Sequence, residues 1–178
     1  MIHRMLLVGA FALVASVSHA QEKAAAPAPA YIGVKKCMMC HKGEAKGMVH
    51  EKWLASKHAS AIKVLADKKD GSEKKAECLA CHTTGFNKGG YVPGAETAPE
   101  FENVQCEACH GPGADYKLTH GKDLAAAAKA GFIAVPSVET CKGCHNEKSP
   151  SFKKDKPFNF EEMHKKIDHR YRDKAGSK

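Results

Sequence analysis

Apolar side chains of this chain are grouped in short helical stripes, which long polar and glycine-rich segments separate. Residues 49–65 repeat apolar side chains at spacings of three and four, which predicts one amphipathic helix ending near residues 70–71. Glycines and prolines predict a loop over residues 85–99, with at most a short hairpin, and a break at residues 111–113. The predicted buried face of the helix contains Leu54, His58, Ala61, Ile62 and Leu65.

Two shorter helices are predicted in the C-terminal half of the chain. One spans residues 123–130, with Gly131 placed to end it. The other begins after Asn159, which forms a capping-box pattern with Glu162, and it continues through Ile167. The predicted fold is therefore mainly α-helical with extensive loops and little or no sheet.

The N-terminus has the pattern of a cleaved secretory signal peptide. A basic start at Arg4 precedes a short apolar run, and small residues at Ser18 and Ala20 provide a cleavage site. An Ala/Pro-rich stretch follows and reads as a flexible tether. The expected divisions are a signal peptide over 1–20, a tether over 21–30, one domain over 31–172 and a disordered tail over 173–178. Export to the periplasm is therefore expected.

The composition is too poor in large apolar side chains for an ordinary core. From Gln21 onward, Leu, Ile, Val and Phe make up 22 of 158 residues, about 14%. A fraction below roughly 20%, together with high net charge, is typical of disordered chains. A large apolar cofactor would supply the missing core.

All eight cysteines belong to four copies of the pattern Cys-x-x-Cys-His. This pattern is the signature of c-type haem attachment, in which two thiols form thioethers and the histidine binds the iron. Zinc ribbons and disulfide scaffolds do not need a histidine after each second cysteine, so they explain the pattern poorly. The sequence predicts four covalently attached haem c groups, held by Cys37, Cys40 and His41; Cys78, Cys81 and His82; Cys106, Cys109 and His110; and Cys141, Cys144 and His145.

The formal net charge of +8 does not indicate nucleic-acid binding. Removal of Arg4 with the signal leaves +7, and the propionates of four haems would bring the holoprotein close to neutral. Lysines are scattered among glutamates, without an aromatic-interleaved basic stripe. No apolar run outside the signal approaches the roughly 20 residues that a membrane helix needs, so stable membrane insertion is not expected.

Candidates for the second axial position of each iron are the remaining histidines. His58 lies on the apolar face of its predicted helix, and His120 lies in a segment that returns toward the core. On the last helix, periodicity favours His164 over His169. His50 lies at the edge of its helix face and is expected to be a spectator or a propionate partner, while Met48 and Met163 are the weaker sulfur candidates.

Four segments are similar to the tetrahaem cytochrome c-554 family. They are residues 31–37, 53–59, 81–91 and especially 104–113, which reads Val-Gln-Cys-Glu-Ala-Cys-His-Gly-Pro-Gly. The resemblance implies a mainly α-helical fold with haems in closely stacked pairs. It also implies that three haems have two histidine ligands each, whereas the second haem is five-coordinate.

The resemblance also implies a set of distal ligands. By position they fall on His58, His120 and His169, and the third contradicts the periodicity argument for His164. Fraying of the helix after Ile167 would free His169 to turn inward, so we expect His169 to be the ligand.

The expected function is that of a periplasmic tetrahaem c-type cytochrome that transfers single electrons between redox protein partners. An alternative is a haem enzyme that reduces a small nitrogen oxide, such as nitric oxide, at an open haem beside His82. A third interpretation is a structural subunit of a larger haem conduit.

Overall fold

The computed structural model describes residues 30–170. The predicted signal peptide, most of the tether and the C-terminal tail lie outside these residues. Within 30–170, no helix has the length and apolarity that crossing a lipid bilayer requires.

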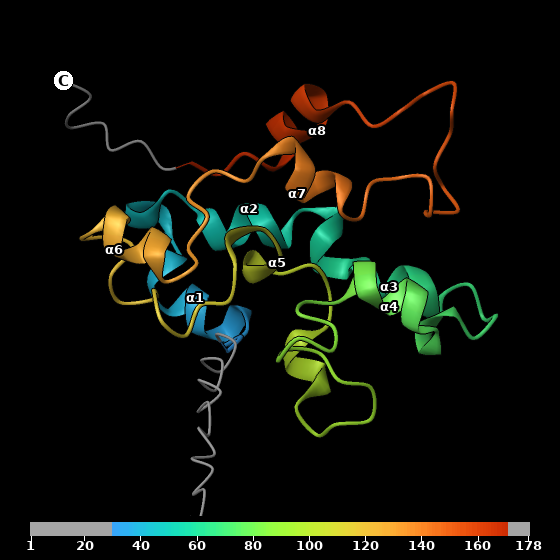
Figure 1. Cartoon of the computed structure of the whole chain (residues 1–178), viewed down its shortest axis with the longest axis horizontal. Helices are drawn as coiled ribbons and strands as arrows, with labels where there is room; N and C mark the ends of the chain where they lie inside the picture. The colour runs from blue at the N-terminus through green and yellow to red at the C-terminus, as the bar shows by residue number, and fades with distance from the viewer. Residues whose placement is uncertain (1–29, 171–178) are drawn as a thin grey trace, which may run out of the picture.

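The described chain is built from short helices joined by turns and loops, as the sequence predicts (Figure 1). In this part of the chain, β-pairing is limited to two isolated bridges. The four 3-10 helices span Glu44–Lys46, Lys57–Ser60, Ser72–Lys74 and Ala98–Phe101. The α-helices are α1 (Val34–His41), α2 (Val49–Leu54), α3 (Ala61–Ala66), α4 (Ala76–His82), α5 (Cys106–His110), α6 (Leu124–Lys129), α7 (Val138–Lys142) and α8 (Phe160–Ile167).

The helices are arranged around α2 and α5, which lie near the middle of the molecule (Figure 1). Helix α1 packs against both α2 and α5, while α3 and α4 pack against each other. Helices α7 and α8 lie along the upper edge in this view, and α6 lies at the left edge. Segments far apart in the sequence therefore meet at the centre.

The helix ends that the sequence predicts in the C-terminal half are confirmed. The Asp123 side chain accepts a hydrogen bond from the Ala126 N–H at the start of α6, and Gly131 follows its end with φ of 92°. Asn159 caps α8 by accepting from the Glu162 N–H at 3.1 Å. Helix α8 ends at Ile167, where Asp168 takes an extended conformation. The chain therefore leaves the helical path just before His169.

The single helix predicted over residues 49–65 is wrong. The chain forms α2, breaks at Ser56 in an extended conformation, and continues as a 3-10 turn into α3. Leu54, placed on the predicted buried face, is 60% exposed. The break has a tertiary cause, because the Val104 N–H donates to the His58 carbonyl at 3.1 Å and the Trp53 indole donates to the Val104 carbonyl at 2.9 Å. These long-range hydrogen bonds override local periodicity.

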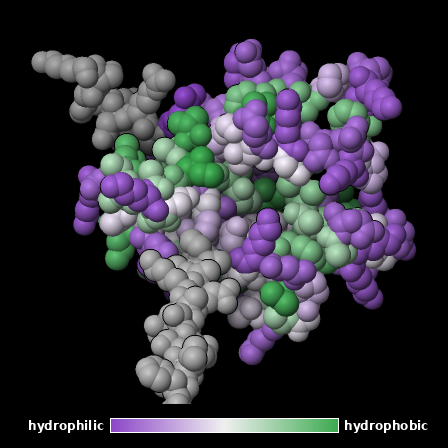
Figure 2. Space-filling view, viewed as in Figure 1, coloured by the Kyte–Doolittle hydropathy of each residue, from purple (hydrophilic) through white to green (hydrophobic). Residues whose placement is uncertain are grey.

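The buried apolar core of the described residues is small. One cluster contains Leu65, Leu79, Tyr91, Ala98 and Phe101. Other large apolar side chains are exposed, and Figure 2 shows hydrophobic surface reaching solvent around a hollow on this face. Met39 and Leu118 are 75% and 76% exposed, respectively. Much apolar surface is thus left uncovered by protein alone.

Candidate functional site

Each Cys-x-x-Cys-His motif lies on a short helix or at its end. The first three motifs end α1, α4 and α5, while α7 contains Cys141, and Cys144 and His145 lie in the turn that begins at Gly143. In a helix, residues separated by three and four positions lie on the same face. In the first three motifs, both thiols and the imidazole therefore point to one side of the helix, as attachment of one flat cofactor requires.

The four motifs lie next to one another as a continuous series, and their eight cysteines are free thiols. The hydrogen bond with Cys106 and burial raise the pKa of Cys37, which shows that the first and third motifs touch. Burial, with Cys81 alongside, raises the pKa of Cys144 to about 12, so the second and fourth motifs are also neighbours. Burial, with Cys141 nearby, raises the pKa of Cys109 to about 11.

Three motif histidines each face a second histidine from a distant segment. The Nε2 atoms of His41 and His120 are 3.3 Å apart, and their ring centroids are 5.5 Å apart. The rings of His110 and His169 are separated by 5.7 Å. The rings of His58 and His145 are separated by 6.0 Å. The structure therefore brings together the distal candidates His58, His120 and His169 with three of the four motif histidines.

The imidazoles are held in the form that binds a metal. Burial lowers the pKa of His41, His58, His110 and His145, which favours neutral rings. Backbone carbonyls accept hydrogen bonds from the Nδ1 atoms of four rings, so the Nε2 atoms keep their lone pairs. The Nδ1 pairs are His82 with Ala61 (2.6 Å), His110 with Ile133 (2.7 Å), His120 with Tyr116 (3.1 Å) and His169 with Ile167 (2.8 Å).

His82 is the exception among the motif histidines. Its Nδ1 atom is fixed by the Ala61 carbonyl, yet no histidine ring of the described residues lies opposite it. Its neighbours Thr83 and Thr84 are buried and use their hydroxyls on the Leu79 and Asn103 carbonyls, respectively. These hydroxyls therefore stabilise the local backbone.

The remaining candidates are placed away from the motif histidines. His50 lies against Trp53 with ring centroids 5.6 Å apart, and His164 stacks on Phe160 at 5.1 Å. Met48 and Met163 are both 38% exposed. Of the two histidines on the last segment, only His169 approaches a motif histidine.

Aromatic side chains that the sequence analysis did not single out pack against the paired histidines. Phe132 stacks on His110 with centroids 5.9 Å apart and contacts His120 at 5.2 Å. Phe158 stacks on His145 at 4.6 Å. Tyr116 positions His120 through its carbonyl. No local sequence signal identifies these residues, because their roles depend on contacts between distant segments.

The side chains present fit haem. In the described residues, no three Cys, His, Asp or Glu side chains converge on a common metal position. A pair of imidazoles suits an iron that already has four porphyrin nitrogens. If haem is bound, His41 and His120 would hold one iron between them, since their Nε2 atoms already face each other at 3.3 Å.

Unpaired polar atoms also indicate a missing group. In the described residues, four buried side-chain polar atoms have no hydrogen-bond partner, and three of them lie on α2 and the turn after it. They are His50 Nδ1, Glu51 Oε2 and Ser56 Oγ. Buried polar groups are normally satisfied by protein, water or ligand, so these three atoms indicate that a group besides the polypeptide contacts this segment.

Comparison with known proteins identifies relatives of this chain. The family model described as "Cytochrome c554 and c-prime" matches residues 36–111. Cytochrome c-554 of Nitrosomonas europaea is 36% identical over 121 residues, which cover 60% of this chain and 48% of that protein. The chain thus matches about half the length of this curated relative. The reduced-state structure of cytochrome c554 from the same organism superposes with a TM-score of 0.52 at 30% identity and 79% coverage of both chains. The chain therefore belongs to the cytochrome c-554 family of c-type cytochromes, with covalently attached haem c as its cofactor.

Proposed function

We propose that this chain is a periplasmic tetrahaem cytochrome that carries single electrons between redox protein partners. The observation that carries the proposal is the pairing of three motif histidines with His58, His120 and His169. Two histidine ligands close an iron to small molecules and favour electron transfer. When bound, haem supplies reversible one-electron chemistry at its iron.

In this proposal the chain holds and orients the four haems. The cysteine pairs form the thioethers, His41, His82, His110 and His145 are the proximal ligands, and the three paired histidines are the distal ligands. Contacts between the first and third motifs, and between the second and fourth, keep attachment points close. Short separations between neighbouring sites favour electron movement through the protein.

The location and the domain limits are part of the same proposal. The secretory signal over residues 1–20 supports export to the periplasm, with a mature domain over 31–172. The tether over 21–30 and the tail over 173–178 are proposed to lie outside this domain.

A second candidate function is the reduction of a small nitrogen oxide at the second site. The observation that favours it is that His82 faces no other histidine within residues 30–170. The hydroxyls of Thr83 and Thr84 donate to the Leu79 and Asn103 carbonyls, so neither hydroxyl is free to give a proton to a substrate there. We therefore favour the carrier.

A redox titration of the purified holoprotein tests the proposal. We expect reversible uptake of four electrons, and no catalytic consumption of nitric oxide beyond the electrons stored. Sustained turnover of nitric oxide with an electron donor would instead establish the enzyme.

A further inference from the structure

Glu107 is a buried carboxylate between the two cysteines of the third motif. Glu107 is only 2% exposed to solvent. It accepts hydrogen bonds from the N–H groups of Ile32 at 2.9 Å, Gly33 at 2.7 Å and Gly113 at 2.6 Å. A buried charge is costly unless it is fully hydrogen-bonded, and an ionised carboxylate accepts from several donors. The site is therefore built for a negative charge.

Two of these donors lie at the start of α1, the helix of the first motif. Gly33 is the residue that precedes α1, and the first N–H groups of a helix have no partner within the helix. The next one, of Val34, donates to Gln105 Oε1 at 2.7 Å. Gln105 and Glu107, on either side of Cys106, therefore accept hydrogen bonds from the backbone N–H groups at the beginning of α1. The helix dipole also favours a negative charge at this position.

The third donor joins the turn after α5 to the same carboxylate. A Cβ atom at Gly113 would lie 2.9 Å from Ile32 Cδ1 and 3.0 Å from Glu107 Oε1. Only glycine allows this close approach without displacing its neighbours. Three separate segments are thus fitted to one carboxylate, and the thiols of Cys37 and Cys106 touch beside it.

The charge of Glu107 also acts on its surroundings. Burial and the charge of Glu107 raise the pKa of both Tyr31 and Tyr116. These tyrosines lie on different segments, so the field of the carboxylate extends to both sides of the contact between α1 and α5.

We propose that Glu107 is a positioning residue that fixes the first and third haem sites against each other, while its buried charge favours the oxidised iron at these sites. The inference rests on the proposed function, because it takes His41 and His110 as iron ligands. A negative charge stabilises Fe(III) relative to Fe(II), and its effect is strongest where water is excluded. At an effective dielectric constant of about 20, a unit charge on the order of 10 Å from an iron changes its reduction equilibrium on the order of tenfold.

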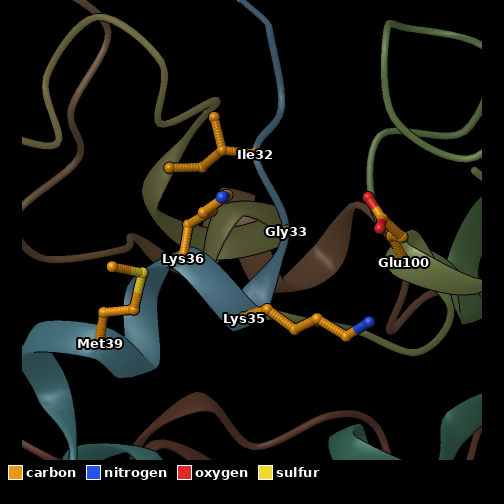
Figure 3. A pocket seen from close by; sticks show the side chains of 6 residues that line it. All are labelled: Ile32, Gly33, Lys35, Lys36, Met39 and Glu100. Atoms are coloured by element: carbon orange, nitrogen blue, oxygen red, sulfur yellow. The ribbon is translucent and has the colours of Figure 1, made fainter.

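Glu107→Gln tests the charge with little change of shape, and Glu100→Gln is the matched control. Glu100 lies across a cavity of about 200 Å³ from the start of α1, and its side chain is exposed (Figure 3). Spectroelectrochemical titration of the haem-loaded variants measures the potentials. For Glu107→Gln we expect one or two of the four reduction equilibria to shift about tenfold toward Fe(II), about 59 mV for one electron. For Glu100→Gln we expect less than about a twofold shift, because water screens exposed charges.

Glu107→Asp keeps the charge and separates the electrostatic effect from loss of shape. Its potentials should stay close to those of the wild type. If Glu107→Gln binds four haems and all potentials are unchanged, the inference is overturned. If Glu107→Gln loses haem, peptide mass mapping decides: loss confined to the Cys37–Cys40 and Cys106–Cys109 peptides supports the inference, and equal loss at all four motifs overturns it. A wild-type protein without haem would refute the proposed function instead.

Discussion

Replacement of His169 by alanine should open one iron while leaving its thioethers intact. Helix α8 ends at Ile167, and the turn places the His169 ring 5.7 Å from the His110 ring. The Ile167 carbonyl holds the Nδ1 atom at 2.8 Å, which leaves Nε2 for the metal. His164 instead stacks on Phe160 at 5.1 Å. The two histidines of this segment therefore have different roles in the structure.

The number of low-spin haems expected before and after the replacement follows from the number of histidine pairs. Three of four motif histidines face a second imidazole, so three irons of the wild type should be low-spin. His169→Ala should reduce this number to two, because an iron without its second strong ligand becomes high-spin. Electron paramagnetic resonance and near-infrared magnetic circular dichroism of the oxidised protein count the two populations.

His164→Ala is the matched control and should keep three low-spin haems. The opposite pattern, with low-spin haem lost in His164→Ala and kept in His169→Ala, would show that α8 continues regularly past Ile167 in the holoprotein. If neither replacement changed the spectrum, the last segment would provide no iron ligand. A second haem would then be open to small molecules, which would favour the nitrogen-oxide-reducing enzyme over the electron carrier.

Three further predictions concern other parts of the chain. His58→Ala and His120→Ala should each convert one low-spin haem to high-spin, whereas His50→Ala should leave the spectrum unchanged; the reverse result would contradict the pairing. Replacement of all eight cysteines by serine should leave a chain with weak helical circular dichroism and rapid proteolysis, since the apolar core is small, and a cooperative thermal transition would argue against this. Trp53→Phe should lower the free energy of unfolding by about 1 kcal/mol in urea titrations, because the Val104 carbonyl loses its indole donor; no change would show that water replaces the donor.

Local sequence signals predicted the motif positions and the C-terminal helix ends. The spacing of Asn159 and Glu162 was sufficient for the cap of α8, because a cap depends only on neighbouring residues. The motif cysteines and histidines are identifiable for the same reason. Which distal histidine faces each motif histidine, in contrast, depends on how the chain folds.

The break between α2 and α3 could not be predicted from periodicity. It depends on Val104 and Trp53, which are far apart in the sequence and meet only in the folded chain. The choice of His169 over His164 likewise depends on the chain leaving its helical path at Asp168. Similarly, nothing in the sequence distinguishes Glu107 from an ordinary charged helix residue. Its role is visible only in the folded chain, where the N–H groups of two other segments donate hydrogen bonds to its carboxylate.

A combined haem assay and spin-state spectrum of the wild-type holoprotein tests the central proposal most directly. Pyridine haemochrome analysis and mass spectrometry should give four covalent haems per chain. Magnetic circular dichroism should then show three low-spin haems with two histidine ligands and one high-spin haem. The pairs of His41, His110 and His145 indicate the first number, and His82, which faces no other histidine within residues 30–170, indicates the second. Fewer than four haems, or two or more high-spin haems in the intact protein, would contradict the proposed arrangement.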